Sequence, residues 1–505
     1  MQPSPAAAPQ RGGSLHRPRT TGSLALALAT LVLVSSPSTE AQDAASAADD
    51  GQTFSVMGLL AQHGLHDIHN ESWNLYGQFT YISSVHPSFS APYTNANGSI
   101  NSLLPDAEWS FTGTFTLFFG LRLWPGGEGY LVPEIISEQP FSGLKGIGGA
   151  IQNFELQKTG GVTPSLYHSR IYLRQTIELG GSEIVRPSGI MSLGTVVDSR
   201  RIVLTLGNFS YLDVFDRNNV AFDPRQTFLN MAFMTYAAWD FAADARGYSY
   251  GGTAELYWDD WVLRFGRMAP PQNPNQLPIN FHIWQYYGDA LELEHDHVLF
   301  GQPGVIRILG YRNFEVIGNF SDAIDAFKAN PAQNAANCGT NFNYGSGNFN
   351  APDLCWVRKP NQKLGIGVSI EQFVARDIGI FLRAMYADGQ SEVDAFDPAD
   401  RSFTIGAIAR GSWWGRPLDL TGVGFGMSWI SSIHAQYLAM GGVDAFVGDG
   451  LLQHAGGEGI VEIFYSVNFF KAIWLTGDYQ FLWHPGFNVA RGPVDIFGVR
   501  VHAEF

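Results

Sequence analysis

The chain ends in the stretch VDIFGVRVHAEF, residues 494–505. Successive side chains of an extended strand point to opposite faces, so this stretch would separate its apolar and polar residues. The apolar side would carry Phe497, Val499, Val501, Ala503 and Phe505. The polar side would carry Gly498, Arg500, His502 and Glu504. Such a strand, closed by an aromatic residue, is typical of the end of a bacterial outer-membrane barrel, although a half-buried strand of a soluble β-sandwich alternates in the same way.

The composition favours the barrel over the sandwich. Of the 505 residues, 13% are aromatic and 15% are charged, whereas an ordinary soluble domain has about 25% charged residues. Apart from one segment near the N-terminus, no apolar run approaches the ~20 residues of a membrane helix. The apolar residues of the chain therefore alternate with polar ones along strands and do not form long apolar helices. Its net charge of −16 argues against nucleic acid as a partner.

Residues 1–41 have the pattern of an export signal. Arg11, Arg17 and Arg19 form a basic lead, an apolar run covers residues 24–34, and a small, polar tail follows. The run is too short to span a membrane, and cleavage after Ala41 fits the small residues there. We therefore expect a signal peptide at 1–41, a periplasmic leader at 42–72 and an outer-membrane barrel at 73–505.

Alternating segments recur from residue 73 to the end of the chain. They predict an all-β fold, a transmembrane antiparallel β-barrel of about 16 strands with constriction loops folded inward. The expected strands lie near 73–83, 109–124, 128–136, 167–180, 200–208, 247–258, 261–268, 288–298, 304–314, 363–374, 377–388, 401–412, 419–430, 457–469, 472–483 and 494–505. A barrel of this size encloses an aqueous channel rather than a packed core.

The connections between these strands alternate in length. Tight links are expected at 124–128, 259–260, 375–377, 413–418 and 470–471. Long loops are expected at 84–108, 137–166, 209–246, 269–287, 315–362, 389–400, 431–456 and 484–493. Short turns on the periplasmic side and long loops outside are the layout of outer-membrane barrels. One exception stands out, the link 181–199, which is long where a turn is expected.

Several stretches carry a family resemblance. They are WNLYGQFT at 73–80, LRLWPGG at 121–127, RRIVLTLGNFS at 200–210 and the segment 213–225, which begins with DVFD. In this order they resemble the bacterial carbohydrate-selective porins, the OprB-like family of outer-membrane porins, from about residue 73 to the end. The resemblance implies a water-filled barrel, narrowed by inward loops, that passes sugars and polyols through the outer membrane.

The residues that could select a solute lie where loops meet strands. Loop 209–246 is rich in aromatic residues, so it is more stable against the inner wall than in water. The candidate pore-lining residues are Glu134, Glu155, Arg170, Arg174, Asp213, Asp216, Arg225, Trp239 and Asp240. Carboxylates and guanidinium groups hydrogen-bond sugar hydroxyls, and aromatic faces pack against sugar rings. A wall residue such as Arg500, near the periplasmic end of the last strand, is expected to influence solute choice little.

Three other motifs are not assigned a functional role, and no metal or cofactor is expected. The leader carries three histidines whose spacing would suit a metal ion if the segment were helical, but no fold anchors them and their role stays open: His63, His66 and His69. His295 and His297 lie at a strand end, where solvation of the rim explains them. The glycine-rich segment 422–426 lies on a strand, so it indicates close packing rather than a phosphate-binding loop.

Three functions compete. The first is a porin that prefers mono- and small oligosaccharides or polyols, embedded in outer-membrane lipid. The second is a general porin for small hydrophilic solutes. The third, a lipid-cleaving barrel enzyme, would need a serine beside a histidine, and Ser431, Ser432 and His434 lie in no recognisable motif. The sequence therefore predicts a porin and not an enzyme, and it leaves open which sugar is preferred and whether the protein is a monomer or a homotrimer.

The two cysteines of the chain, Cys338 and Cys355, are predicted to form a disulfide. Both lie in one polar loop without histidine, and an exported protein meets an oxidising compartment. Closing a loop of this length is worth roughly 3 kcal/mol to the loop itself. Thiol labelling of the denatured, unreduced protein should detect no free thiol, and two reactive thiols would refute the pairing.

Overall fold

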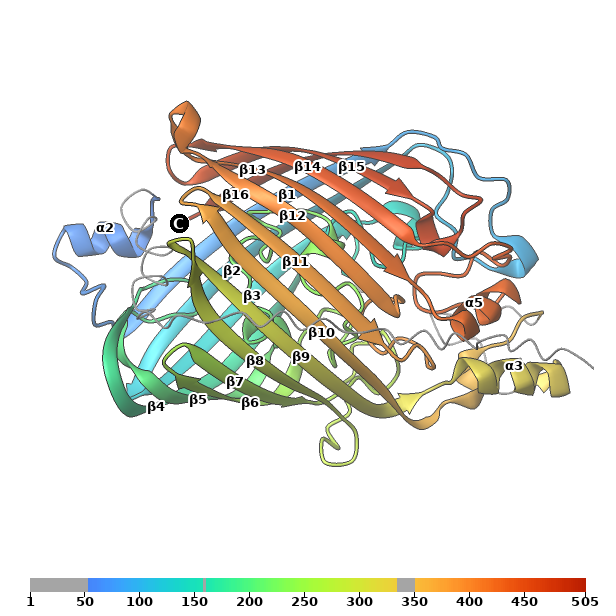
Figure 1. Cartoon of the computed structure of the whole chain (residues 1–505), viewed down its shortest axis with the longest axis horizontal. Helices are drawn as coiled ribbons and strands as arrows, with labels where there is room; N and C mark the ends of the chain where they lie inside the picture. Colours follow the sequence, from blue (N-terminus) through green and yellow to red (C-terminus); the bar gives the residue numbers. More distant parts are fainter. Residues whose placement is uncertain (1–52, 158–159, 334–349) are drawn as a thin grey trace, which may run out of the picture. The chain divides into compact units, whose positions relative to one another are not determined.

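The structure is a computed structural model that describes residues 53–157, 160–333 and 350–505. Sixteen antiparallel strands form a closed barrel in which each strand pairs with its neighbours in sequence and β1 pairs with β16. Figure 1 shows the strands tilted around the barrel, with α3 and α5 at the end that carries the long loops and α2 and the C-terminus at the other end. The predicted fold class is therefore confirmed.

The strands are β1 Trp73–His86, β2 Glu108–Trp124, β3 Gly127–Gln139, β4 Ser165–Arg186, β5 Thr195–Phe209, β6 Ser249–Trp258, β7 Trp261–Met268, β8 Tyr287–Leu299, β9 Gln302–Ile317, β10 Lys359–Ala375, β11 Ile378–Ala387, β12 Arg401–Gly411, β13 Arg416–Trp429, β14 Glu458–Phe469, β15 Ile473–Trp483 and β16 Val494–Glu504. The described helices are α2 Val56–Gln62, α3 Phe320–Ala329 and α5 Ser432–Ala439. Short 3-10 turns cover Ala96–Gly98, Phe141–Gly143, Tyr211–Asp213, Met231–Phe233, Leu354–Val357, Ser412–Trp414 and Pro485–Phe487.

The link expected at 181–199 is the one clear departure from the predicted elements. β4 continues to Arg186 and β5 begins at Thr195, so only residues 187–194 connect them. The two strands remain paired to the end, with Arg186 opposite Thr195. Ile184 pairs with Val197 and Val185 with Val196, but these adjacent apolar residues break the simple alternation and the register shifts beside Gly180. That irregularity hides the strand extension in the sequence.

Burial along the strands follows the predicted alternation. In β16, Phe497 and Val499 are about half exposed on the outer face, whereas Arg500 and His502 are fully buried on the inner face. A charged side chain turned to lipid at mid-membrane would cost about 2–4 kcal/mol, which explains the inward placement of the arginine. The outer surface therefore presents apolar residues to lipid, and the charged wall faces the lumen.

The last residue helps to close the barrel. The backbone N–H of Gly77 donates to the carbonyl of Phe505 at 2.9 Å, and the N–H of Phe505 donates to the carbonyl of Gly77 at 3.0 Å. The Phe505 ring lies directly over Gly77, where a Cβ atom would come within 2.3 Å of it. The same ring stacks on Phe115 with a centroid distance of 6.2 Å. Only a glycine leaves room for this terminal aromatic contact.

The described part of the leader, residues 53–72, lies against the end of the barrel that carries the short turns. The Phe54 N–H donates to the carbonyl of Lys471 in the turn between β14 and β15, at 2.9 Å. Helix α2 ends at Gln62, so the three leader histidines do not share a helical face. The predicted signal peptide, residues 1–41, lies outside the described residues.

No helix within the described residues is long and apolar enough to cross a membrane. Nor does this part of the chain contain a group of three or more His, Cys, Asp or Glu side chains that could hold a metal ion.

The long loop between β5 and β6 fills much of the barrel interior, as its aromatic content predicts. Phe215, Phe233 and Trp239 are each at most 1% exposed. Arg383 of β11 donates hydrogen bonds to two carbonyl groups of this loop, those of Phe233 at 2.8 Å and Ala221 at 2.6 Å. The loop is thus tied to the wall on the far side of the lumen from its own strands.

The cysteine loop is described only in part. Cys355 is disulfide-bonded. Its predicted partner, Cys338, lies outside the described residues, so the pairing itself stays a prediction.

Removing Phe505 should impair barrel closure more than pore function. The variant loses two backbone hydrogen bonds and the ring contact with Phe115, so we expect a severalfold lower yield of the folded, heat-modifiable form on gels. Phe470→Ala, at an exposed turn residue, is the control and should assemble normally. Equal yields for both variants would contradict the role assigned to the terminal residue.

Candidate pore constriction

A cavity of about 890 Å³ lies inside the barrel. Its walls combine strand residues with residues of two inward loop segments, 140–157 and 210–248. Six of the predicted pore-lining residues contribute to it: Glu134, Glu155, Arg170, Arg174, Asp213 and Arg225. This cavity is the candidate site of solute selection.

One side of the cavity is built around Arg225 of the long β5–β6 loop. Its Nε lies 2.8 Å from Oε1 of Glu155, and its Nη2 lies 3.4 Å from Oε2 of Glu134. Glu155 comes from the β3–β4 loop and Glu134 from β3, so three separate segments meet here. Both carboxylates also accept hydrogen bonds from threonines of β2, namely Thr114 and Thr116. The cluster holds two loops against the wall while leaving polar groups beside the lumen.

Burial acts on the carboxyl of Glu155. Loss of solvent raises its pKa above the ordinary value, and the neighbouring Arg225 guanidinium lowers it only in part. This carboxyl therefore takes up a proton at a higher pH than an ordinary glutamate, and protonation weakens its attraction to Arg225.

A second ion pair joins Arg170 of β4 to the β5–β6 loop. Its Nε and Nη2 atoms each lie 2.7 Å from a carboxylate oxygen of Asp213, in the bidentate geometry that arginine favours. Asp213 also belongs to a capping box with Ser210 at the start of a 3-10 turn. The Arg170 guanidinium lies 5.1 Å from the ring centroid of Tyr248. The pair fixes the beginning of the loop and places a cation and an aromatic ring together.

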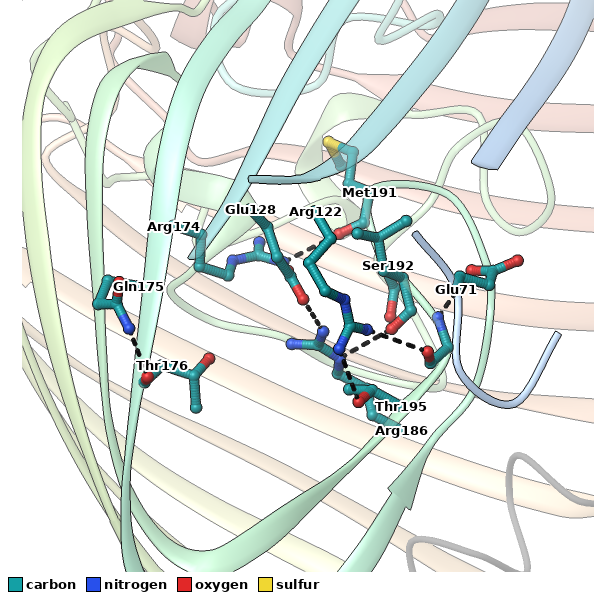
Figure 2. A network of polar contacts seen from close by, with 12 residues as sticks. Glu71, Arg122, Glu128, Arg174, Gln175, Thr176, Arg186, Met191, Ser192 and Thr195 are labelled. Atoms are coloured by element: carbon teal, nitrogen blue, oxygen red, sulfur yellow. Dashed lines mark hydrogen bonds and ion pairs between the residues drawn. The ribbon is translucent and has the colours of Figure 1, made fainter. Parts of the chain in front are cut away.

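Arg174 lies four residues after Arg170 on β4, nearer the end of the barrel that carries the short turns. Its guanidinium carbon is 5.2 Å from the ring centroid of Tyr130 and 5.5 Å from that of Tyr172. Its Nη1 donates to the carbonyl of Met191 at 2.9 Å. Figure 2 shows this contact among several arginines that converge on the turn between β4 and β5.

The other three candidates, Asp216, Trp239 and Asp240, do not line the cavity and instead hold the loop in position. Asp216 pairs with Arg383 at 2.8 Å and accepts from Thr235. Trp239 packs in the aromatic core of the loop. Asp240 lies 3.0 Å from Nζ of Lys363 and accepts N–H groups from the β11–β12 loop. Sequence alternation cannot separate such anchors from pore-lining groups, since both are polar and inward.

Arg500 also differs from its expected role. It donates hydrogen bonds to the carbonyl groups of Pro224 and Thr227 in the β5–β6 loop, at 2.6 and 2.7 Å. The strand pattern correctly gives its direction, but it does not reveal what lies across the lumen. Arg500 is therefore an anchor of the constriction loop and a poor control for pore function.

Sequence reasoning missed part of the cavity wall. Further arginines line it, and so do residues of the β4–β5 turn: Arg186, Arg201, Arg217, Arg246, Arg376, Ile190, Met191 and Ser192. Arg201 could have been found from strand alternation, because it lies in the expected strand 200–208 on the same face as Val203. The turn residues carry no comparable signal, because an exposed turn and an inward one have similar composition.

The remaining motifs have local roles. His66 lies 3.0 Å from Glu71, and His297 lies 3.0 Å from the side chain of Gln372. Ser431 donates to the carbonyl of Gly389 at 2.6 Å and caps helix α5 by accepting from the His434 N–H. The serine hydroxyl is thus engaged with backbone groups at the base of the outer loops.

Comparison with known proteins gives a family match and structural neighbours. A family model described as carbohydrate-selective porin, OprB family, matches residues 108–505. The high-pH structure of Pseudomonas putida OprB aligns with a TM-score of 0.60 at 13% identity, covering 86% of this chain and 94% of that one. The low-pH structure of the same protein gives a TM-score of 0.44 at 10% identity, covering 90% and 99%. No curated protein sequence matches the chain.

The anchoring role of Asp240 can be measured as stability. Asp240→Ala leaves the Lys363 ammonium, whose side chain is 2% exposed, without its carboxylate partner. Breaking a buried pair in this way costs about 3–5 kcal/mol. The matched control is Asp322→Ala, which removes the exposed partner of Lys359 and should cost roughly 0–1 kcal/mol. Urea unfolding in detergent, followed by tryptophan fluorescence, compares the two, and equal losses would rule out the anchor.

Proposed function

The chain belongs to the OprB family of carbohydrate-selective porins, and from this premise we propose that it lets sugars and polyols diffuse passively into the periplasm. It is an outer-membrane porin, a channel and not an enzyme. The proposed solutes are mono- and small oligosaccharides or polyols. The runner-up is a general porin without preference for carbohydrates.

The observation that supports a carbohydrate preference is the mixture of groups around the cavity. Arg225 with its two glutamates offers donors and acceptors on one side, and Arg170 with Asp213 offers them on another. A sugar presents many hydroxyl groups, each of which can donate and accept. Opposite charges side by side leave a small net attraction for ions, which suits neutral solutes.

Aromatic rings complete the match to a sugar. Tyr248 and Tyr257 line the same cavity, each beside an arginine that also lines it. A pyranose ring has apolar faces between its hydroxyl edges, and such faces pack well against aromatic rings. The cavity therefore offers both kinds of contact within reach of one solute.

We also propose the organisation of the mature protein. Residues 1–41 act as a removed signal peptide, residues 42–72 form a periplasmic leader, and residues 73–505 form the barrel. The contact of Phe54 with the β14–β15 turn supports the leader assignment, because the short turns of outer-membrane barrels face the periplasm.

Shortening the cavity residues should weaken carbohydrate preference. Glu155→Ala, Arg174→Ala and Arg225→Ala each remove a hydrogen-bonding head and widen the constriction. A hydrogen bond to a charged group is worth about 1.5–3 kcal/mol and a neutral one about 0.5–1.5, so we expect severalfold effects. In liposome swelling, the ratio of the rate with sugars to the rate with size-matched solutes should fall. Ion conductance should stay equal or rise.

The matched control for these variants is Arg200→Ala. Arg200 is an exposed arginine that pairs with Asp259 at the turn between β6 and β7, away from the cavity. It should leave the sugar-to-ion permeability ratio unchanged. If all three cavity variants also keep the wild-type ratio, the protein is a general porin.

A further inference from the structure

The turn between β4 and β5, residues 187–194, folds into the barrel. Ile190, Met191 and Ser192 of this turn line the same cavity as the constriction residues. The turn lies at the end of the barrel that carries the short connections, so it reaches the lumen from the periplasmic side. The loops that fold inward from the other end of the barrel therefore face the β4–β5 turn, which enters the lumen from the periplasmic end.

Chain connectivity does not require so long a turn. Arg186 and Thr195 are direct partners in the sheet, and a two-residue turn is enough to join paired residues of an antiparallel hairpin. The other connections at this end are shorter, for example 125–126, 259–260 and 300–301. The extra residues thus have a task other than closing the hairpin.

Arginines of the wall hold the turn by its backbone. Arg174 Nη1 donates to the carbonyl of Met191 at 2.9 Å, and Arg186 Nε donates to that of Leu193 at 3.2 Å. Arg122 Nη2 reaches the carbonyl of Gly194 at 3.4 Å. Figure 2 shows these arginines around the turn, with Glu128 bridging to Arg186. Several charged donors on one short segment fix it in a single position.

The leader holds the turn from its other side through Glu71, which is 1% exposed. The Glu71 carboxylate accepts from the Ser188 hydroxyl at 2.6 Å and from the Gly194 N–H at 2.7 Å. It also accepts from Asn74 at 3.1 Å, and the same amide nitrogen donates to the carbonyl of Ser192 at 2.8 Å. The side chain therefore connects the leader, β1 and both ends of the turn.

We propose that residues 187–194 form a second selectivity element at the periplasmic exit of the pore, with Glu71 as its positioning residue. Ile190 and Met191 add apolar side chains to the same cavity that Arg174 and Arg186 line with cationic groups. That pairing suits a solute with an apolar face and a hydroxyl edge, so the element deepens the proposed carbohydrate function and rests on it. Its effect on pore width does not depend on which solute is preferred.

The direct test replaces residues 187–194 with Asn-Gly, the sequence that favours a two-residue hairpin turn. Single-channel conductance of the full chain in planar bilayers should rise at least twofold. The ratio of the liposome swelling rate with sugars to that with size-matched solutes should fall. Met191→Ala keeps the backbone and should shift both quantities in the same direction by a smaller factor. Val196→Ala, which truncates an exposed outward residue of the same hairpin, is the control and should change neither.

A second test isolates the positioning role of Glu71. Glu71→Gln weakens the bonds that hold the turn, so it should raise conductance in the native chain. It should have no effect on conductance once the turn has been replaced by Asn-Gly. Asp67→Asn, a change of the same kind on an exposed leader residue, is the control. If Glu71 had only a structural role, Glu71→Gln would lower the temperature at which the folded form is lost on gels, both with the native turn and with the Asn-Gly turn. Conductance would then stay unchanged.

The conductance and swelling measurements separate the role of the turn from the carbohydrate preference. Unchanged conductance after turn replacement and in Met191→Ala overturns the second element, whatever the wild-type solute preference is. Wild-type protein without carbohydrate preference overturns the proposed function, while a conductance rise on turn replacement would still support the turn as a narrowing of the exit.

Discussion

A membrane leaves no water for unpaired backbone groups, and the structure follows from this requirement. A sheet can cross the bilayer only if its first and last strands pair, since an open edge would leave a row of N–H and C=O groups in hydrocarbon. Here β1 and β16 pair over Gln78 to Val85, and Phe505 extends the closure to Gly77. The alternation of every strand follows, because a closed wall has one face in lipid and the other toward the lumen.

A closed sixteen-stranded wall encloses more space than its own side chains fill, so the loops set the width and the lining of the pore. The β5–β6 loop crosses the lumen and is secured by buried charges from strands on the far side, including Arg383, Lys363 and Arg500. The charged lumen therefore has two uses. Some groups hold the loop, and others, such as Arg170 and Arg225, also face the cavity.

The sequence predicted the wall well and the pore less well, for a physical reason. Alternation is forced by lipid at every strand, so all sixteen strands were predicted, and Arg500 was correctly turned inward. What an inward side chain meets depends on loops that arrive from elsewhere in the chain. The sequence therefore does not show that three inward residues anchor the loop: Asp216, Asp240 and Arg500. The inward β4–β5 turn is also missed, because its strands continue past a register shift at Gly180.

We propose that this porin favours carbohydrates over other solutes of equal size. The most direct measurement is liposome swelling with purified wild-type protein, using neutral sugars and polyols beside size-matched amino acids and carboxylates. The account predicts that sugars enter severalfold faster than the matched solutes. Rates that follow solute size alone would contradict it.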